Sequence, residues 1–506
     1  MEECRNVKSD LFCCFVDFRK AFDTVPRNNL WIRLEELKVP FELRAATIRL
    51  YENVIAKFKS NEGWSKDIKC NIGVKQGCPL SPTLFGIYID MLEGCLEEVG
   101  CAGMILAEIV IILLLYADDI VLLARCSSNL AKQLHLLKDF CYNMGMTVNT
   151  DKTKVMIIKS KKDTFANFVY DNSNLEEVSS YKYLGIDIHH KLNWNYSIAK
   201  RINAGWKAYF GLENNCKAAN LVMWDKKKLL FETLVTPVIL YGCEVWGCSI
   251  SRESWRKIEQ IQKRFITYNL KIKNNTPYPI LLIEVGLPPI ESLAMTRLML
   301  YKNKINNMGD HRLPKLALNS SQNHRRLKRG WYNDTRSWLN HWEIDENVAL
   351  QNINNIKNII TSKFKEKLWC EKDLEAKRKL RYYKEVINPT LEDQNYLSVL
   401  ISPKKKINIA KIRTNSHELH SETGRWTVPK TPWVERICHL CESKNIEDEN
   451  HFLLECPAYT HIRSQFHNLC CNTDIPSLLA CQNYSKLGTL LSKLFEHRNI
   501  TLKQTN

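Results

Sequence analysis

Two adjacent carboxylates stand between two apolar runs in the segment LLLYADDIVLLA, Leu113–Ala124. Each run is short and rich in residues that favour strands, so we expect a hairpin with Asp118 and Asp119 at its tip. Like charges beside buried strands are unfavourable unless a cation compensates them. Carboxylate oxygen is the ligand that hard divalent cations prefer. The segment therefore predicts a metal site, and a solvated Asp-Asp turn is the alternative.

A third carboxylate, Asp17, lies within another strand-like run, FCCFVDFRKAFDTV, Phe12–Val25. Phosphoryl transfer by two metal ions needs carboxylates from separate strands that converge on ions about 4 Å apart. Asp17 and Asp118 are distant in the sequence, so only a fold can bring them together.

A glycine-containing loop lies between these segments, in GVKQGCPLSPTLFGIYIDML, Gly73–Leu92. Gly73 and Gly77 permit a close approach of the backbone to a ligand. Ser81 and Pro82 predict the start of a helix, with Ser81 as its N-cap. Such a loop suits a phosphate or a nucleotide, and an ordinary turn is the alternative.

A second chemical cluster has the spacing Cys438-x2-Cys441-x9-His451-x4-Cys456. Three thiolates and one imidazole suit a closed tetrahedral zinc site, with no position left open for catalysis. We expect the metal to organise the fold of this segment. Four unrelated buried residues are the alternative.

The composition limits the class of protein. Lys and Arg number 72 and Asp and Glu 55, so the formal net charge is +17. A basic chain suits a nucleic-acid partner, because Lys and Arg release counterions when they meet phosphates. The 19 cysteines follow no secretory signal, which favours a reducing, intracellular compartment. The most apolar stretch, Ile109–Tyr116, is too short to span a membrane.

The elements that must position these residues can be read from periodicity. Residues 11 to about 190 alternate strand-like runs with helical patterns, which predicts a domain of mixed helices and strands. Residues 191–310 are mostly helical. The segment His324–Trp342 interleaves Arg and Lys with Trp and Tyr. Such a surface can bind nucleic acid, and a helix with structural tryptophans is the alternative.

Taken together, the segments resemble the reverse transcriptases of LINE-type (non-LTR) retrotransposons. Three motifs match in order: FVDFRKAFD, GVKQGCPLSPTLF and YADD. Later motifs match at GMTVNTDKTKVM, Gly145–Met156, and at SYKYLGIDI, Ser180–Ile188. The Cys/His cluster resembles the C-terminal zinc knuckle of these elements, whose family role is to handle RNA or target DNA.

The resemblance implies an α+β fold: a right-hand polymerase palm, with a mixed sheet and packed helices, over residues 1–190. A helical thumb over 191–310, a basic, mostly helical linker region over 311–425, a CCHC zinc knuckle over 426–470 and a C-terminal tail over 471–506 would follow. Few residues precede Phe12. We therefore expect an N-terminally truncated chain that lacks the fingers region and the endonuclease of the family.

The resemblance also implies residue roles. Asp17 and Asp118 would bind two magnesium or manganese ions, with Asp119 as the third catalytic carboxylate. The partners would be an RNA template, a DNA primer or target, and dNTPs. The substrate-binding residues would be Phe22, Gln76, Gly77, Tyr116 and Lys152.

Two of these roles have alternatives. Phe22 matches the family's steric gate against a ribose 2′-hydroxyl, and a core phenylalanine is its alternative. Lys152 matches a lysine that assists the leaving pyrophosphate; a solvated lysine is its alternative, and Lys154 is a competing candidate.

The resemblance thus implies an RNA-directed DNA polymerase, and a location in the nucleus and cytoplasm is expected from the family. The alternatives are a catalytically incompetent remnant that retains nucleic-acid and zinc binding, and a decayed copy with no selected function.

Overall fold

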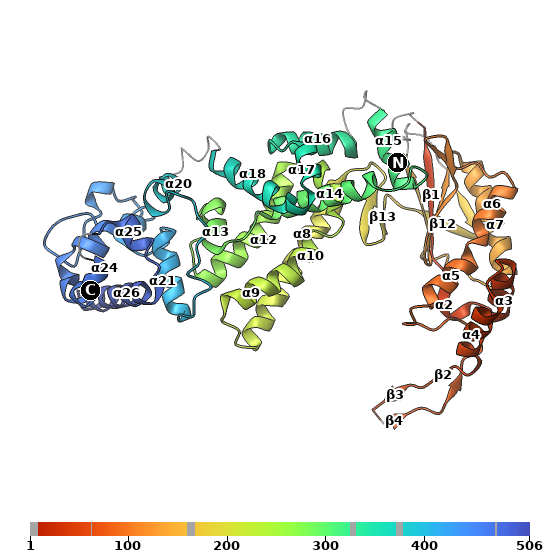
Figure 1. Cartoon of the computed structure of the whole chain (residues 1–506), viewed down its shortest axis with the longest axis horizontal. Coiled ribbons are helices and arrows are strands. Elements are labelled where there is room, and N and C mark those ends of the chain that lie inside the picture. Colours follow the sequence, from red (N-terminus) through yellow and green to blue (C-terminus); the bar gives the residue numbers. More distant parts are fainter. Residues whose placement is uncertain are drawn as a thin grey trace. The chain divides into compact units, whose positions relative to one another are not determined.

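The computed structural model describes residues 9–61, 63–158, 167–323, 330–370, 378–470 and 473–505 (Figure 1). The chain divides into two compact units. Unit 1 comprises Met1–Ser197 and Met308–Asn333, and unit 2 comprises Ile198–Asn307 and Asp334–Asn506. Each unit is described below by itself.

Unit 1 is built on a six-stranded mixed sheet with the strand order β11-β12-β10-β1-β9-β8. The β1 strand lies between β9 and β10 and is antiparallel to both, whereas β10 and β12 run parallel. Every residue of β1 is buried, so this strand is the centre of the unit. The predicted mixed sheet with packed helices is confirmed. The strands of the sheet are β1 (Leu11–Val16), β8 (Leu113–Tyr116), β9 (Asp119–Ala124), β10 (Lys154–Ile158), β11 (Phe168–Tyr170) and β12 (Ser173–Glu177).

The two faces of the sheet have different coverings. Alternate residues of a strand point to opposite faces, and Phe12, Cys14 and Val16 belong to a core shared with helices. Leu11, Cys13 and Phe15 belong to a second core, shared with two β-hairpins. The helices of unit 1 are α2 (Ala21–Thr24), α3 (Arg27–Glu36), α4 (Phe41–Glu52), α5 (Ser81–Ile89), α6 (Met91–Glu98), α7 (Ser127–Asn143) and α15 (Leu313–Asn323). The two hairpins are β6–β7 (Met104–Leu106, Ile109–Ile111) and β13–β14 (Ser180–Tyr183, Ile186–His189).

A narrow antiparallel arm extends from unit 1 beyond α4 (Figure 1). Its base is the pair β2 (Ile55–Ala56) and β5 (Ile68–Lys69), and its tip is the pair β3 (Lys59–Ser60) and β4 (Gly63–Trp64). We call residues 54–72 the β-arm.

The regular elements of unit 2 among the described residues are all helices, joined by turns and irregular segments. Helix α8 (Trp194–Ala218) leads into it from unit 1. The helices of its first half are α9 (Trp224–Leu230), η1 (Phe231–Val235), α10 (Thr236–Ile239), α11 (Cys243–Trp246), η2 (Gly247–Ser249), α12 (Arg252–Leu270), α13 (Tyr278–Val285), α14 (Ile290–Asn306), α16 (Trp331–His341), α17 (Glu346–Gln351) and α18 (Ile356–Cys370). Those of its second half include α20 (Arg378–Tyr382), η4 (Tyr383–Ile387), α21 (Pro403–Arg413), α22 (His420–Thr423), η6 (His451–Glu455), η7 (Pro457–Tyr459), α23 (Thr460–Arg463), α24 (His467–Cys470), α25 (Ile475–Leu479) and α26 (Tyr484–Thr505).

A buried ion pair ties several of these helices together. The Arg413 guanidinium on α21 donates from Nε to both carboxylate oxygens of Glu284 on α13, at 2.9 and 3.2 Å. The hydroxyls of Tyr383 and Tyr396 donate to the same carboxylate at 2.5 and 2.8 Å. The guanidinium also donates to the carbonyl of Leu479 at 2.8 Å. The network therefore links α13, η4, α21 and α25.

Arg413→Met is expected to destabilise the chain by about 3–5 kcal/mol, because it leaves the Glu284 charge buried without its cation. The exposed pair of Arg381 and Glu385 supplies a matched control, and Arg381→Met is expected to cost no more than about 1 kcal/mol. Urea unfolding followed by tryptophan fluorescence measures both. Equal losses for the two variants would contradict this reading of the network.

In the basic and aromatic segment His324–Trp342, residues 324–329 lie outside the described residues, and two of the described tryptophans are buried. The side chains of Trp338 and Trp342 are only 7% and 1% exposed. Their indole N–H groups donate to the carboxylate of Glu291 at 2.8 and 2.9 Å. For Trp338 and Trp342, the alternative of a helix with structural tryptophans therefore holds.

Among the described residues, no single helix combines the length and the apolar character needed to cross a membrane. Two bent helix pairs, Trp224–Ile239 with Cys243–Ser249 and Tyr278–Val285 with Ile290–Asn306, pass that test by length and composition alone.

Candidate functional site

The predicted hairpin between Leu113 and Ala124 is confirmed. Strands β8 and β9 pair antiparallel, and Tyr116 is opposite Asp119 across the turn. Ala117 adopts the left-handed backbone conformation, with φ of 53°, which lets two residues reverse the chain. Asp118 and Asp119 are exposed at the end of the sheet, and so is Tyr116.

The register of the sheet brings Asp17 to the same end. Val16 on β1 is opposite Ile120 on β9. One further step along this antiparallel ladder places Asp17 opposite Asp119. The Asp17 amide donates to Thr153 Oγ1 at 3.1 Å, and its carbonyl accepts from the Asn149 amide at 2.7 Å. These two bonds fix the backbone of Asp17 at the end of its strand.

The three carboxylates influence one another electrostatically. Burial raises the pKa of Asp119, and the negative charges of Asp118 and Asp17 raise it further. Raised pKa values of this kind arise where like charges share a site, and a bound cation would relieve the repulsion. The donor set fits divalent metal ions, because all three side chains offer hard oxygen ligands from two neighbouring strands.

Two tyrosines of β13, which were not among the residues predicted for the carboxylate site, border the carboxylates. Burial and the charge of Asp119 raise the pKa of Tyr181 and of Tyr183. Tyr181 stacks on Phe15 of β1, with ring centroids 4.1 Å apart. The signal in the sequence was the repeated Tyr of SYKYLG, on a strand that packs against the same face of the sheet.

The structure distinguishes the two candidate lysines. Lys152 Nζ lies 3.9 Å from Asp17 Oδ2, and its side chain is largely exposed. Lys154 Nζ instead forms an ion pair with Glu176 Oε2 on β12, at 2.6 Å. Of the two, Lys152 is therefore the one placed beside a candidate catalytic carboxylate.

Three of the predicted substrate-binding residues share one pocket of about 450 Å³. The pocket is lined by Phe22, Lys75, Gln76, Gly77, Cys78, Pro79, Ser81 and Pro82.

A Cβ at Gly77 would meet no atom within 4 Å, so the backbone there faces open space. Gly73, by contrast, is required by packing, because a Cβ would lie 2.6 Å from the Asp23 carbonyl oxygen. Tyr116 and Lys152 are not among the lining residues.

The loop that forms the pocket is bonded to the segment that follows Asp17. Gln76 Nε2 donates to Asp23 Oδ1 at 3.0 Å. The Val74 amide donates to the Phe22 carbonyl at 2.7 Å. These bonds hold Phe22 and Gln76 at fixed positions on the wall of the pocket.

The ring of Phe22 also stacks on the buried Phe85, with centroids 4.8 Å apart. Phe22 thus both contributes to the core and faces the pocket, and its two alternatives stay open.

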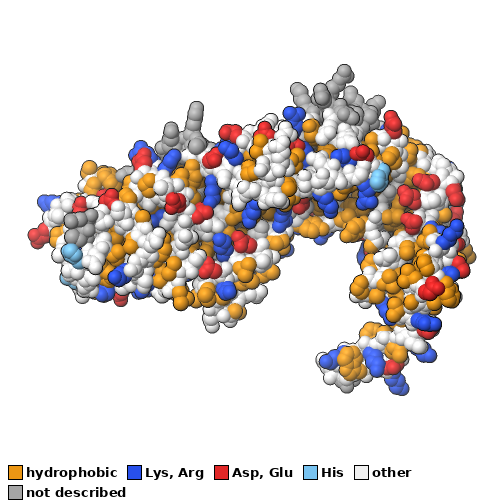
Figure 2. Space-filling model, viewed as in Figure 1, with side chains coloured by type: hydrophobic (Ala, Val, Ile, Leu, Met, Phe, Trp, Pro, Cys, Tyr) orange, Lys and Arg blue, Asp and Glu red, His pale blue; other side chains and the backbone are white. Residues whose placement is uncertain are grey.

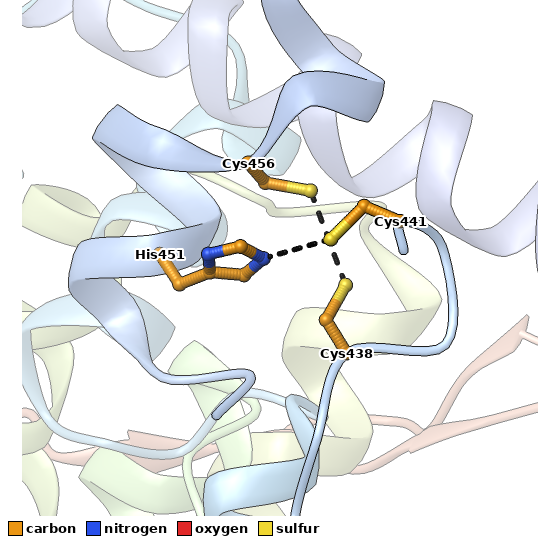
Figure 3. Close-up of side chains that lie close together, drawn as sticks. All are labelled: Cys438, Cys441, His451 and Cys456. Carbon is orange, nitrogen blue, oxygen red and sulfur yellow. Dashed lines mark hydrogen bonds between the residues drawn. The ribbon is translucent and has the colours of Figure 1, made fainter. Parts of the chain in front are cut away.

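In unit 2, the four predicted zinc ligands lie together (Figure 3). All their ligand atoms lie within 4.8 Å of one another. Cys438 Sγ and Cys456 Sγ are 3.9 Å apart, and Cys441 Sγ is 3.3 Å from His451 Nε2. A tetrahedron with zinc–sulfur bonds of about 2.3 Å has edges of about 3.8 Å. The geometry therefore fits one tetrahedral metal ion.

The three thiols of the Cys/His cluster differ in their pKa values. Burial raises the pKa of Cys441, but hydrogen bonds from Ser443 and His451 outweigh it and bring the value to about 7. Burial raises the pKa of Cys456 to about 12, and it also raises that of Cys438. Cys441 is therefore the thiol that ionises most readily in the absence of a cation.

The Cys/His cluster depends on contacts beyond the predicted boundary at residue 470. Arg498 on α26 forms a double hydrogen bond with the buried Glu447, at 2.7 and 2.8 Å. The ring of Phe452 packs on Phe495, with centroids 5.1 Å apart. The predicted C-terminal tail thus contains a helix that packs against the segment carrying the Cys/His cluster.

Comparison with known proteins indicates which protein family the chain resembles. The family model described as "Reverse transcriptase (RNA-dependent DNA polymerase)" matches residues 1–188. Residues 1–188 are a reverse transcriptase domain. This domain contains the carboxylates and the pocket, whereas the Cys/His cluster lies outside it.

Relatives of the chain come from mobile elements. A Pol polyprotein from the type-1 retrotransposable element R2 of Nasonia vitripennis is 25% identical over 369 residues, which are 70% of this chain and 34% of that protein. A putative transposon-derived protein of Caenorhabditis elegans is 34% identical over 135 residues, 26% of this chain and 47% of that protein. The RNA-directed DNA polymerase from mobile element jockey of Drosophila funebris is 23% identical over 261 residues, 50% of this chain and 28% of that protein.

These names confirm the predicted resemblance to LINE-type reverse transcriptases. The chain spans 28–47% of the length of these curated relatives.

Proposed function

We propose that the chain is an RNA-directed DNA polymerase that adds nucleotides from dNTPs to the 3′-hydroxyl of a primer on an RNA template. The observation that carries this proposal is the convergence of Asp17 and the Asp118-Asp119 turn at one end of the sheet. The glycine loop that lines the pocket belongs to the same unit.

Asp17 and Asp118 would hold two magnesium or manganese ions, with Asp119 as a third negative group. When bound, the ions would neutralise charge on the transferred phosphoryl group and on the attacking and leaving oxygens. Positioning and electrostatic stabilisation would supply most of the rate enhancement, as in phosphoryl transfer generally.

The chain's own side chains would position the substrates. The open space over Gly77 allows a nucleotide to approach the backbone. Asp23 orients the amide of Gln76, which would contact the nucleotide and the template. Tyr116 would face the primer end from the turn. Lys152 would stabilise the leaving pyrophosphate, giving up its contact with Asp17 when the site is loaded.

In this proposal the six-stranded sheet is the polymerase palm, and the first helices of unit 2 are the thumb. Cys438, Cys441, His451 and Cys456 would hold a structural zinc ion in a CCHC knuckle that handles RNA or target DNA. A nuclear and cytoplasmic location would follow from the same family.

Phe22→Val is expected to increase ribonucleotide incorporation relative to deoxyribonucleotide incorporation, because a smaller side chain would admit the 2′-hydroxyl. Parallel primer-extension assays with dNTPs and rNTPs measure this ratio. Phe85→Leu is the matched control, since it changes the ring beneath Phe22 without altering the pocket wall. An unchanged ratio in Phe22→Val, with a lower unfolding temperature, would make Phe22 a core residue only.

The second candidate function is a catalytically incompetent remnant that binds nucleic acid and zinc. The fit of the Cys/His cluster favours zinc binding under either function. Primer extension separates the two, since a remnant binds primer and template without extending the primer.

A further inference from the structure

The β-arm exposes large apolar side chains that no core in its own strands can cover. Phe58 and Trp64 are each 67% exposed, and Ile55, Ile68 and Ile72 are exposed as well. A two-stranded hairpin is only marginally stable by itself. Exposed apolar clusters on such an element mark a surface that contacts a partner.

The base of the β-arm is fixed to the rest of unit 1. The Arg27 guanidinium donates to the carbonyl of Tyr51 at 3.0 Å, just before the arm begins. It also donates to the carbonyls of Gly73 at 2.9 Å and Ile72 at 3.2 Å, where the arm ends. The chain continues from there into Lys75 and Gln76, on the wall of the pocket. The arm therefore starts and ends beside the pocket.

The two faces of the arm tip differ in chemistry. Lys59 is directly opposite Trp64, so both side chains lie on one face. The Lys59 ammonium lies 5.7 Å from the centroid of the Trp64 ring. Lys66 is exposed and lies two residues beyond Trp64, just past the end of β4. Phe58 is one residue before Lys59 and lies on the opposite face, beside Ser65, to which its amide and carbonyl are bonded.

The charged residues of the arm indicate which kind of partner it binds. The sequence of the arm contains four lysines, at 57, 59, 66 and 69, and two acidic residues, Glu62 and Asp67. Asp67 pairs with Lys57 at 2.9 Å. Figure 2 shows lysine and hydrophobic side chains interspersed on the arm. Basic groups beside exposed aromatic rings suit single-stranded nucleic acid, because phosphates meet the cations and unpaired bases stack on the rings. An apolar protein partner would not require the lysines.

We propose that the Trp64 face of the β-arm binds single-stranded nucleic acid, with a base stacked on Trp64 and phosphates contacted by Lys59 and Lys66. The identification of that strand as the template rests on the proposed polymerase function. The binding itself does not.

The test measures binding of the full chain to a fluorescent 20-nucleotide oligo(U), followed by anisotropy over a range of salt concentrations. Trp64→Ala is expected to weaken binding by about ten-fold, within the range for loss of one stacked base. Phe58→Ala is the matched control: the ring is equally exposed but lies on the other face. Its affinity should stay within about two-fold of the parent.

The charged contacts have a separate readout. Lys59→Gln and Lys66→Gln should each reduce the slope of log affinity against log salt by about 0.7, the value for one phosphate contact on a single strand. Unchanged slopes would overturn the phosphate contacts.

Three results would overturn the stacking contact: unchanged affinity in Trp64→Ala, an equal loss in Phe58→Ala, or a loss of self-association in Trp64→Ala without a loss of oligo(U) binding. The last result, seen by analytical ultracentrifugation, would make the arm a contact between copies of this chain. Because Trp64 is exposed, thermal unfolding of the variant should match the parent.

Asp118→Asn separates this inference from the proposed function. It should retain oligo(U) binding whether or not the parent extends primers. A parent that binds oligo(U) through Trp64 but extends no primer would refute the polymerase activity alone. A parent that extends primers while Trp64→Ala binds normally would refute the arm alone.

Discussion

Asp118→Asn is expected to reduce RNA-templated primer extension by at least about a hundred- to a thousand-fold, the loss seen when one electrostatic group of a catalytic site is removed. The amide keeps the size of the carboxylate but loses the negative charge that would bind a divalent ion. Asp118 is exposed at the turn, so the fold should tolerate the change. Affinity for primer and template should be largely retained, because most contacts with nucleic acid are made to phosphates elsewhere.

The matched control is Asp139→Asn, which removes an exposed carboxylate from α7 of the same unit. This control should extend primers at the parental rate. Full activity in Asp118→Asn, or an equal loss in Asp139→Asn, would contradict the assignment of the carboxylates.

The full chain is expected to contain one zinc ion, and its removal by a chelator should unfold the second half of unit 2. Structural zinc sites in small peptides contribute about 10–16 kcal/mol at neutral pH. Cys441→Ser should abolish zinc binding, because it removes the thiol that contacts His451. Cys470→Ser is the control, since Cys470 lies on α24 and is not among the four clustered ligands.

Zinc binding should also release protons and weaken as the pH falls. Burial raises the pKa of Cys456 to about 12, so a metal ion must displace the proton of this thiol at neutral pH. Metal analysis of the purified chain gives the stoichiometry, and calorimetry in buffers of different ionisation enthalpy gives the protons released. A chain that folds identically with and without chelator would contradict a structural zinc site.

Local sequence patterns were sufficient to predict the hairpin that carries Asp118 and Asp119 and the clustering of the Cys and His side chains. The apolar runs around Asp118 have strand periodicity, and short spacings bring Cys438 and Cys441 to one site. The convergence of Asp17 with Asp119 was expected only from the resemblance, because no local pattern encodes strand order. Helix starts were predicted less well. Ser81 does not cap α5: it is the first residue of that helix, and its hydroxyl donates to the Lys75 carbonyl.

Long-range partners explain what the sequence could not reveal. Trp338 and Trp342 sit among basic residues, yet their indole groups bond to Glu291 on α14, far away in the sequence. The bond from Arg498 to Glu447, in the segment that carries the Cys/His cluster, depends in the same way on a contact across 51 residues. Burial of this kind follows from tertiary packing, which neither composition nor periodicity specifies.

The position of bound metal ions decides whether Asp17 and Asp118 form the proposed catalytic site. Crystals of the chain grown with Mn²⁺, a dNTP and a primer–template would show the ions by anomalous scattering. The proposed polymerase function predicts two anomalous peaks about 4 Å apart, bridged by the carboxylates of Asp17 and Asp118. Peaks elsewhere, or carboxylates separated by more than about 8 Å in the folded domain, would contradict it, since two such ions cannot be bridged across that distance.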